Sequence, residues 1–160
     1  MQAFTRDGEM YVATLGRSLC QQVVLLCDQV IGAIAEPDSP SVQRLFPDAA
    51  ADEEVASEFR RLTEADARQE KTDRLLWLQT VCADPAGDIR VPRTESNRFA
   101  AAINDLRLVL GEWLGISSGE LPSIRLTSRV YGRAMYDLHT WLQDSLVEEL
   151  LADLAETGDG

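Results

Sequence analysis

Apolar residues recur every three or four positions between residues 96 and 115, and this spacing constrains the fold most strongly. The residues of the main stripe, which lie on one face at about 100° per residue, are Phe99, Ile103, Leu106, Leu110 and Trp113. Leu108 and Val109 make much of the opposite side apolar, as in a helix that is covered from several directions. We therefore predict a central helix that is capped by Thr94 or Ser96 and ends at Gly115.

Four further helices are predicted from the same periodicity. The first covers about residues 15–35 and ends before Pro37, because proline cannot continue a helix. A short acidic helix is expected over about 52–62. A separate helix over about 63–83 follows, since Thr63–Asp66 resembles a capping box. The last helix begins at Ser123 or Thr127 and reaches Ala155.

The N-terminal residues predict a β-hairpin. Apolar positions flank Asp7–Gly8, a dipeptide that favours a tight two-residue turn. Residues 89–92 form a short extended piece, which is consistent with one more strand. The predicted fold is mainly α: a single-domain helical bundle of about four to five helices with a short N-terminal β-hairpin. The domain covers 1–156, with the hairpin at 1–14, helices over 15–155 and a disordered tail at 157–160.

Composition restricts the partners that the chain can have. Its 160 residues are 45% hydrophobic, which is enough for one core. The formal net charge of -12 disfavours direct binding to nucleic acid and favours contacts with proteins. No run of ~18 apolar residues is present to span a membrane, the first residues lack the order of a signal peptide, and three cysteines suit a reducing cytosol. We therefore expect a cytoplasmic protein.

The sequence contains no recognisable catalytic pattern. His139 is the only histidine, and a metal cluster or a proton-shuttling pair normally needs more. Glu148 and Glu149 are adjacent, so they point apart on a helix and are expected to be solvated. A phosphate-binding glycine loop and a nucleophile elbow are both missing from the sequence. We predict a non-enzyme without a metal or another cofactor.

A narrow polar stripe lies beside the main apolar face of the central helix, at Asn104, Arg107 and Gly111. The glycine permits close approach of another backbone, despite a helix cost of about 1 kcal/mol. We favour a buried hydrogen-bonded contact between helices over a ligand site.

Cys20 and Cys27 lie seven residues apart on one helical side, ~10 Å along the axis, so an intact helix keeps them from bonding. Cys82 can reach either one if their helices pack side by side. The functional hypothesis is a thiol switch. The alternative, which we favour, is that buried free cysteines act as small apolar side chains.

Two surfaces of the last helix are candidates for partner binding. Arg125, Arg129 and Arg133 stand four apart with no acid among the residues 123–135. They either pair with the acidic Asp52–Glu54 segment, which we favour, or dock an acidic partner or nucleic acid.

The apolar face also shifts around the helix after Leu142. The residues of the shifted face include Leu146, Leu150 and Leu154. This end either covers the hairpin or pairs with a second copy or a partner helix.

Three strings resemble one protein family. They are Glu58-Phe59-Arg60-Arg61-Leu62-Thr63-Glu64, Asn104-Asp105-Leu106-Arg107-Leu108-Val109-Leu110-Gly111 and Tyr136-Asp137-Leu138-His139-Thr140-Trp141-Leu142-Gln143. In this order they resemble the actinobacterial DUF2017 family, a domain of unknown function, from the Leu45–Pro47 turn to Leu150.

The resemblance implies a small cytoplasmic protein, commonly encoded beside a Clp protease adaptor. It also implies a link to transcription regulation under oxidative stress, with no catalytic residues to carry over. Members vary in their N-terminal part, so Cys20 and Cys27 are expected to be particular to this chain.

Two hypotheses for the function follow. The first is a non-enzymatic regulator of transcription that contacts the transcription machinery and responds to redox state through its cysteines. The second is an accessory or adaptor protein in Clp-dependent proteolysis.

Overall fold

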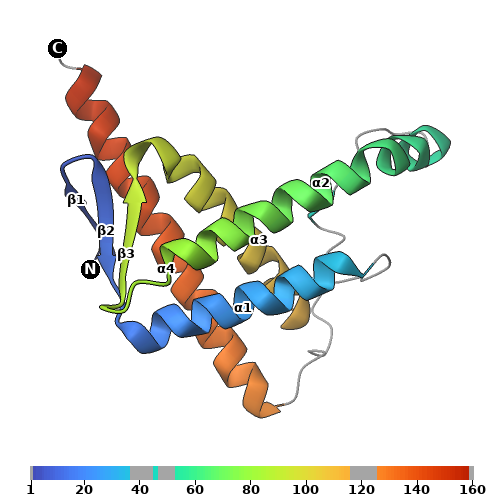
Figure 1. The fold of residues 1–160 in the computed structure, drawn as a ribbon, viewed down its shortest axis with the longest axis horizontal. Coiled ribbons are helices and arrows are strands. Elements are labelled where there is room, and N and C mark those ends of the chain that lie inside the picture. The colour runs from blue at the N-terminus through green and yellow to red at the C-terminus, as the bar shows by residue number, and fades with distance from the viewer. Residues whose placement is uncertain (1, 37–44, 47–52, 116–125, 159–160) are drawn as a thin grey trace.

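The computed structural model describes residues 2–36, 45–46, 53–115 and 126–158, and the side chains of 53–57, 59–62 and 126–129 lie outside the described part. The elements in chain order are β1 Phe4–Asp7, β2 Met10–Thr14, α1 Arg17–Ala35, α2 Glu53–Val81, β3 Asp88–Pro92, the 3-10 turn η2 Arg93–Glu95, α3 Ser96–Trp113 and α4 Leu126–Gly158. Figure 1 shows the small sheet beside the C-terminal half of α4, with α1 and α2 adjacent to each other. The mainly α prediction with an N-terminal hairpin is confirmed.

Helix α3 is the centre of the core, as its periodicity predicted. Phe99, Ile103 and Leu106 have no exposed surface, and Trp113 is half-buried at the end of the helix. Helices α1, α2 and α4 and strand β3 all contact α3. Its C-terminus is also as expected, because Gly115 adopts a positive φ of 68°.

The start of α3 differs from the prediction. Neither Thr94 nor Ser96 provides a side-chain cap. The Ser96 hydroxyl instead donates to the carbonyl of Arg93 at 2.9 Å, within the turn η2. This 3-10 turn leads directly into α3, so its own hydrogen bonds replace a separate cap.

The hairpin belongs to a three-stranded antiparallel sheet with the order β1-β2-β3. Strand β3 is the extended piece expected at 89–92, and its Val91 pairs with Tyr11 of β2. The turn differs from the expected Asp7–Gly8 by one residue. Because Asp7 pairs with Met10, the two loop residues are Gly8 and Glu9. Gly8 takes a φ of 60° at the first position, so only one residue of the turn needs the glycine conformation.

Helix α2 is continuous from Glu53 to Val81, so the predicted break between 62 and 63 is wrong. Thr63 lies inside the helix rather than at its start. The segment contains no proline or glycine and is rich in good helix formers. The backbone amides just after Thr63 are therefore bonded to the preceding turn of α2, so a capping box would have no free amides to satisfy.

Helix α4 extends to Gly158, beyond the predicted end at Ala155. The Thr157 hydroxyl donates to the carbonyls of Asp153 and Leu154 at 3.1 and 3.0 Å. Two of the residues predicted to form a disordered tail are thus helical, because threonine satisfies carbonyls of the last turns. Residues 159–160 lie outside the described part.

A close backbone crossing joins the start of α1 to the loop before β3. The amides of Leu15 and Gly16 both donate to the carbonyl of Gly87, at 3.1 and 3.0 Å. Gly87 has a φ of 84°, and a Cβ at this position would lie 2.3 Å from the amide nitrogen of Arg17. Only glycine fits here, on grounds of both φ and space.

Helix α1 also has the length and apolar character of a membrane-spanning segment, with 19 residues and a mean hydropathy of 1.5. This indication is weak, because a core helix meets the same criterion. Its buried side chains, which face the other helices and the sheet, are Cys20, Val23, Leu26, Cys27, Val30 and Ile34.

The crossing gives a first prediction. Gly8→Ala should cost only the strain of a positive φ, about 1–2 kcal/mol of unfolding free energy, since nothing lies within 4 Å of its Cβ. Gly87→Ala adds a backbone clash, so we expect a loss of roughly 3 kcal/mol or more. Urea unfolding of the two variants measures both, and equal losses would contradict the close approach.

Candidate functional site

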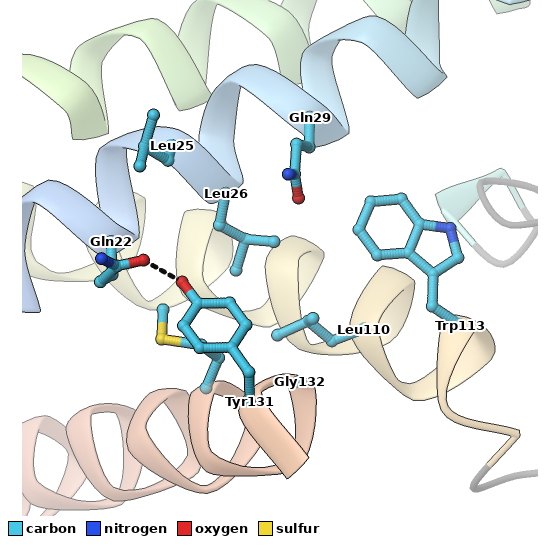
Figure 2. Close-up of a pocket in the computed structure, with 9 residues that line it drawn as sticks. Gln22, Leu25, Leu26, Gln29, Leu110, Trp113, Tyr131 and Gly132 are labelled. Atoms are coloured by element: carbon cyan, nitrogen blue, oxygen red, sulfur yellow. Dashed lines mark hydrogen bonds between the residues drawn. The ribbon is translucent and has the colours of Figure 1, made fainter. Parts of the chain in front are cut away.

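A groove opens between α1, α3 and α4, and its volume is about 410 Å³. The residues that line it, drawn in Figure 2, are Gln22, Leu25, Leu26, Gln29, Leu110, Trp113, Tyr131, Gly132 and Met135. Leu26, Leu110 and Met135 are buried members of the core, so the floor of the groove is apolar. The Tyr131 hydroxyl donates to the side-chain oxygen of Gln22 and links α4 to α1. Sequence reasoning missed this groove, because its residues come from three helices distant in sequence.

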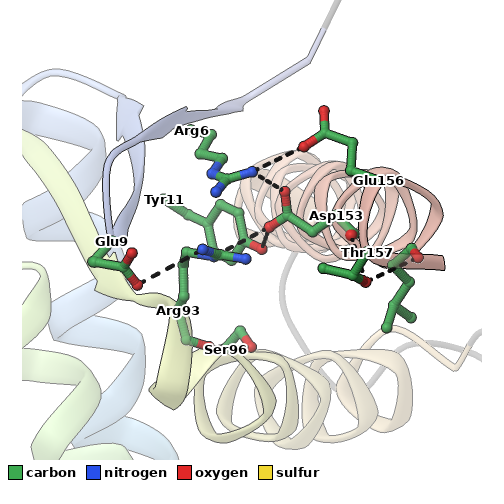
Figure 3. Close-up of polar contacts among 9 residues, drawn as sticks. Arg6, Glu9, Tyr11, Arg93, Ser96, Asp153, Glu156 and Thr157 are labelled. Carbon is green, nitrogen blue, oxygen red and sulfur yellow. Dashed lines mark hydrogen bonds and ion pairs between the residues drawn. The ribbon is translucent and has the colours of Figure 1, made fainter. Parts of the chain in front are cut away.

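A polar cluster fastens the sheet to the end of α4, centred on Asp153. This carboxylate is only 8% exposed and accepts a hydrogen bond from the Tyr11 hydroxyl. Arg6 of β1 and Arg93 of the turn η2 lie 2.8 and 3.3 Å from its carboxylate oxygens (Figure 3). Glu156 adds a second carboxylate to Arg6 at 3.2 Å. The cluster therefore joins residues that are more than 140 positions apart in the chain.

The electrostatics of the cluster favour a structural role. The hydrogen bond from Tyr11, together with Arg6 and Arg93, lowers the pKa of Asp153. Burial and the neighbouring Asp153 raise the pKa of Tyr11. The carboxylate thus stays ionised and the phenol stays protonated near neutral pH, and neither group is suited to proton transfer.

Ser145 makes a second connection between α4 and the sheet. Its hydroxyl oxygen accepts hydrogen bonds from the backbone amides of Ala3 and Phe4, at 2.7 and 2.8 Å. The Phe4 ring in turn meets Phe99 of α3 edge to face, with ring centroids 5.4 Å apart. The end of α4 therefore covers β1, which was one of the two alternatives for this part of the helix.

The cluster gives a second prediction. Tyr11→Phe removes the hydroxyl and leaves a buried carboxylate with one donor fewer, which should cost about 1–2 kcal/mol. Tyr131→Phe is the matched control, because this hydroxyl lies on a half-exposed side chain and its loss should cost less than about 0.5 kcal/mol. Chemical unfolding at neutral pH measures the difference, and equal effects would show that the Tyr11 hydrogen bond contributes nothing special.

The predicted polar stripe of α3 lies in the seam with α4. Arg107 donates to the side-chain oxygen of Gln143, and its guanidinium carbon lies 5.6 Å from the centre of the Tyr136 ring. Gly111 is buried, and a Cβ there would meet the same ring at 3.7 Å. Asn104 is half-buried on the same helix.

Asp105, next to this stripe, is a buried charge that the sequence did not single out. It is 3% exposed and is paired with Lys71 at 3.1 Å and Arg74 at 3.2 Å. Both partners come from α2, so the pair of contacts sets how α2 lies on α3. Removing such a partner from a buried carboxylate is strongly destabilising.

His139 is the most buried titratable group of the same seam. It has no exposed surface, and its Nδ1 lies 2.6 Å from the carbonyl oxygen of Met135. Within the described residues, its Nε2 and the Nε of Arg107 have no hydrogen-bond partner. Burial lowers the pKa of His139 to about 4, and the positive charge of Arg107 acts in the same direction. The imidazole is therefore neutral in the folded chain at neutral pH.

The pKa of His139 gives a third prediction. The unfolded chain binds a proton near pH 6.5 and the folded chain only near pH 4, so stability is complete above pH 6.5 and falls towards pH 4. The loss attributable to this group is about 3 kcal/mol at most. Unfolding free energies measured across this range for the native chain and for His139→Leu should differ in slope, with the shallower slope in the variant. Identical slopes would mean that His139 titrates normally when folded.

All three cysteines are free and buried. The Cys20 thiol donates to the carbonyl oxygen of Gly87 at 3.4 Å. Burial raises the pKa of Cys27 to about 12, and burial together with the nearby Cys20 and Cys27 raises the pKa of Cys82. Helices α1 and α2 do pack side by side, which is the condition set for Cys82 to reach Cys20 or Cys27. The raised pKa values nevertheless make these thiols poor sources of thiolate.

The structure describes only part of the arginine stripe. The Nε of Arg133 is 3.3 Å from a carboxylate oxygen of Asp137, in an exposed pair on one helix. Its guanidinium carbon also lies 5.8 Å from the centre of the Tyr136 ring. Arg125 lies outside the described residues, as do the side chain of Arg129 and those of the acidic Asp52–Glu54 segment. The exposed ion pair between Arg133 and Asp137 contributes little to stability.

The apolar end of α4 divides into two faces. Leu146 is fully buried, so its prediction as a partner-binding residue is wrong. Leu150 is half-buried against the core. Val147, Leu151 and Leu154 are 41%, 60% and 67% exposed and follow one line at helical spacing. We call these three residues the α4 apolar stripe.

The arrangement defines a mainly α domain in which a three-stranded sheet is fastened to the end of a long helix. Among the residues that the structure describes, no group of three or more potential ligands could hold a metal ion. The family model for DUF2017, a domain of unknown function, matches residues 1–150. The chain therefore belongs to the DUF2017 family. Comparison with curated proteins and with solved structures finds no match.

Proposed function

We propose that this chain, an actinobacterial member of its family, is a cytoplasmic, non-enzymatic regulatory protein that acts by binding other proteins. Its proposed partners are the transcription machinery, and it binds neither a membrane nor nucleic acid directly. The net charge of -12 supports protein contacts over contacts with phosphate backbones. The family resemblance supports a role in transcription regulation.

The observation that carries the proposal is the α4 apolar stripe. Leu151 and Leu154 are among the most exposed large apolar side chains of the described residues. They do not belong to a loosely held end, because Ser145 and Asp153 on another side of the helix bind the sheet. A rigid helix that displays apolar side chains at i, i+4 and i+7 is suited to helix-in-groove recognition.

Affinity capture from the native cytosol tests this proposal. The bait is the full chain, and the test variant is Leu151→Glu/Leu154→Glu, which charges the stripe and leaves the buried face intact. Leu76→Glu, at another exposed leucine on α2, is the control. Capture of RNA polymerase or a sigma factor by the native chain and the control, but not by the stripe variant, supports the proposal.

A second candidate is an accessory or adaptor role in Clp-dependent proteolysis, supported by the gene neighbourhood that the family resemblance implies. Capture of the protease adaptor in place of the transcription machinery would favour this alternative. A homodimer through the C-terminal helix is a further outcome. It would appear as a doubled mass in sizing that the stripe variant abolishes. Truncation after Gln143 is unsuitable, because it would also remove Ser145 and Asp153.

A redox response through Cys20, Cys27 and Cys82 is also part of the proposal, and the burial of these thiols sets its condition. An oxidant would react only after the helices open. We predict that the native chain resists alkylation at neutral pH, and that all three thiols react once the chain is unfolded. Intact-mass analysis counts the adducts. Rapid labelling of a single thiol in the native chain would instead indicate a directly reactive cysteine.

A further inference from the structure

The groove between α1, α3 and α4 has the form of a receptor for apolar side chains. Its volume of about 410 Å³ falls within the ~300–1,000 Å³ typical of binding pockets. Figure 2 shows Gln22 and Tyr131 at one end, Leu26 and Leu110 in the middle, and Gln29 beside Trp113 at the other end.

The rim of the groove offers apolar surface to the outside. Leu25 of α1 is 54% exposed and Tyr131 of α4 is 48% exposed, on opposite walls. The side chains of the groove floor are already held in place without a partner, because Leu26, Leu110 and Met135 pack into the core. A partner would therefore bind a formed site rather than complete the fold.

The lining selects the chemistry of the occupant. Among the residues that the structure describes, none of those lining the groove carries a charge, although about a quarter of the chain is charged. The polar groups present are the amides of Gln22 and Gln29, the Tyr131 hydroxyl and the Trp113 indole. A charged group placed against these described residues would lose its hydration without gaining a counter-ion, so the lining favours an apolar group.

The negative net charge of the whole chain favours positively charged residues around that apolar group on the partner. With 27 acidic and 15 basic residues, the chain attracts positively charged partners and repels negatively charged ones. We propose that the groove binds a partner polypeptide whose amphipathic helix inserts apolar side chains and carries lysine or arginine beside them. This inference rests on the proposed function and assigns it a second surface, separate from the α4 apolar stripe.

Titration with a synthetic amphipathic peptide tests the inference. The probe is a helix with leucines at i, i+3, i+4 and i+7 and lysines elsewhere, and its partner probe carries glutamate in place of lysine. Leu25→Lys places a charge on the groove wall. Leu76→Lys is the matched control, since both leucines are about half exposed on helices and both changes alter the net charge equally.

We expect one-to-one binding of the lysine peptide in calorimetry, weakened about tenfold or more by Leu25→Lys and less than twofold by Leu76→Lys. The inference is overturned if the lysine peptide does not saturate, if the glutamate peptide binds as well, or if both variants weaken binding equally. Self-association that Leu25→Lys abolishes would also overturn it, because the occupant would be a second copy. Melting curves of both variants confirm that they are folded.

The proposed function and the groove fail in different ways. If the native chain captures a cytosolic protein and Leu25→Lys captures it equally well, the regulatory proposal stands and the groove assignment falls. If no specific protein is captured while the lysine peptide still binds at the groove, the site stands and the proposed function falls.

Discussion

Helix α3 is apolar on most of its circumference, so it is stable only when other elements cover it from several directions. Helices α1, α2 and α4 and strand β3 supply that cover. The long helices must therefore converge on one central segment, and the sheet must close the side next to Phe99, where Phe4 meets it. The groove lies at the C-terminal end of α3, where Leu110 and Trp113 line it together with residues of α1 and α4.

Polar contacts decide how the covering elements are oriented. Asp153 binds Tyr11 and Arg6 of the sheet and Arg93 of the turn η2. Asp105 pairs with Lys71 and Arg74 of α2. Apolar packing alone is non-directional and would allow the helices to slide. Buried carboxylates that need specific donors restrict each helix to one register. Gly87 acts similarly through the backbone, because any larger residue would collide with the start of α1.

The two faces of α4 separate its contacts within the fold from the surface that we propose for a partner. Leu146, Ser145 and Asp153 face inward and bind the core and the sheet. Val147, Leu151 and Leu154 lie on a different face and remain exposed, so charging them alters the surface without removing an internal contact.

The cysteines, in contrast, are not accessible from the surface. They are enclosed among α1 and the end of α2, with raised pKa values, so any redox chemistry depends on opening of the core.

The sequence by itself determined the features that depend on neighbours along the chain. The periodicity of Phe99 to Leu110 located the buried helix, and Gly115 marked its end. Residues 89–92 were correctly predicted to be extended. Two predictions from short sequence patterns were wrong. The capping-box pattern at Thr63 predicted a helix start, but this residue lies inside the continuous helix α2. Thr157 was assigned to a disordered tail, but it lies in the last turn of α4. Only the tertiary structure decided the Asp153 cluster, the burial of Leu146 and the groove between α1, α3 and α4. Each of these depends on residues that are far apart in sequence and meet only when the helices cover α3.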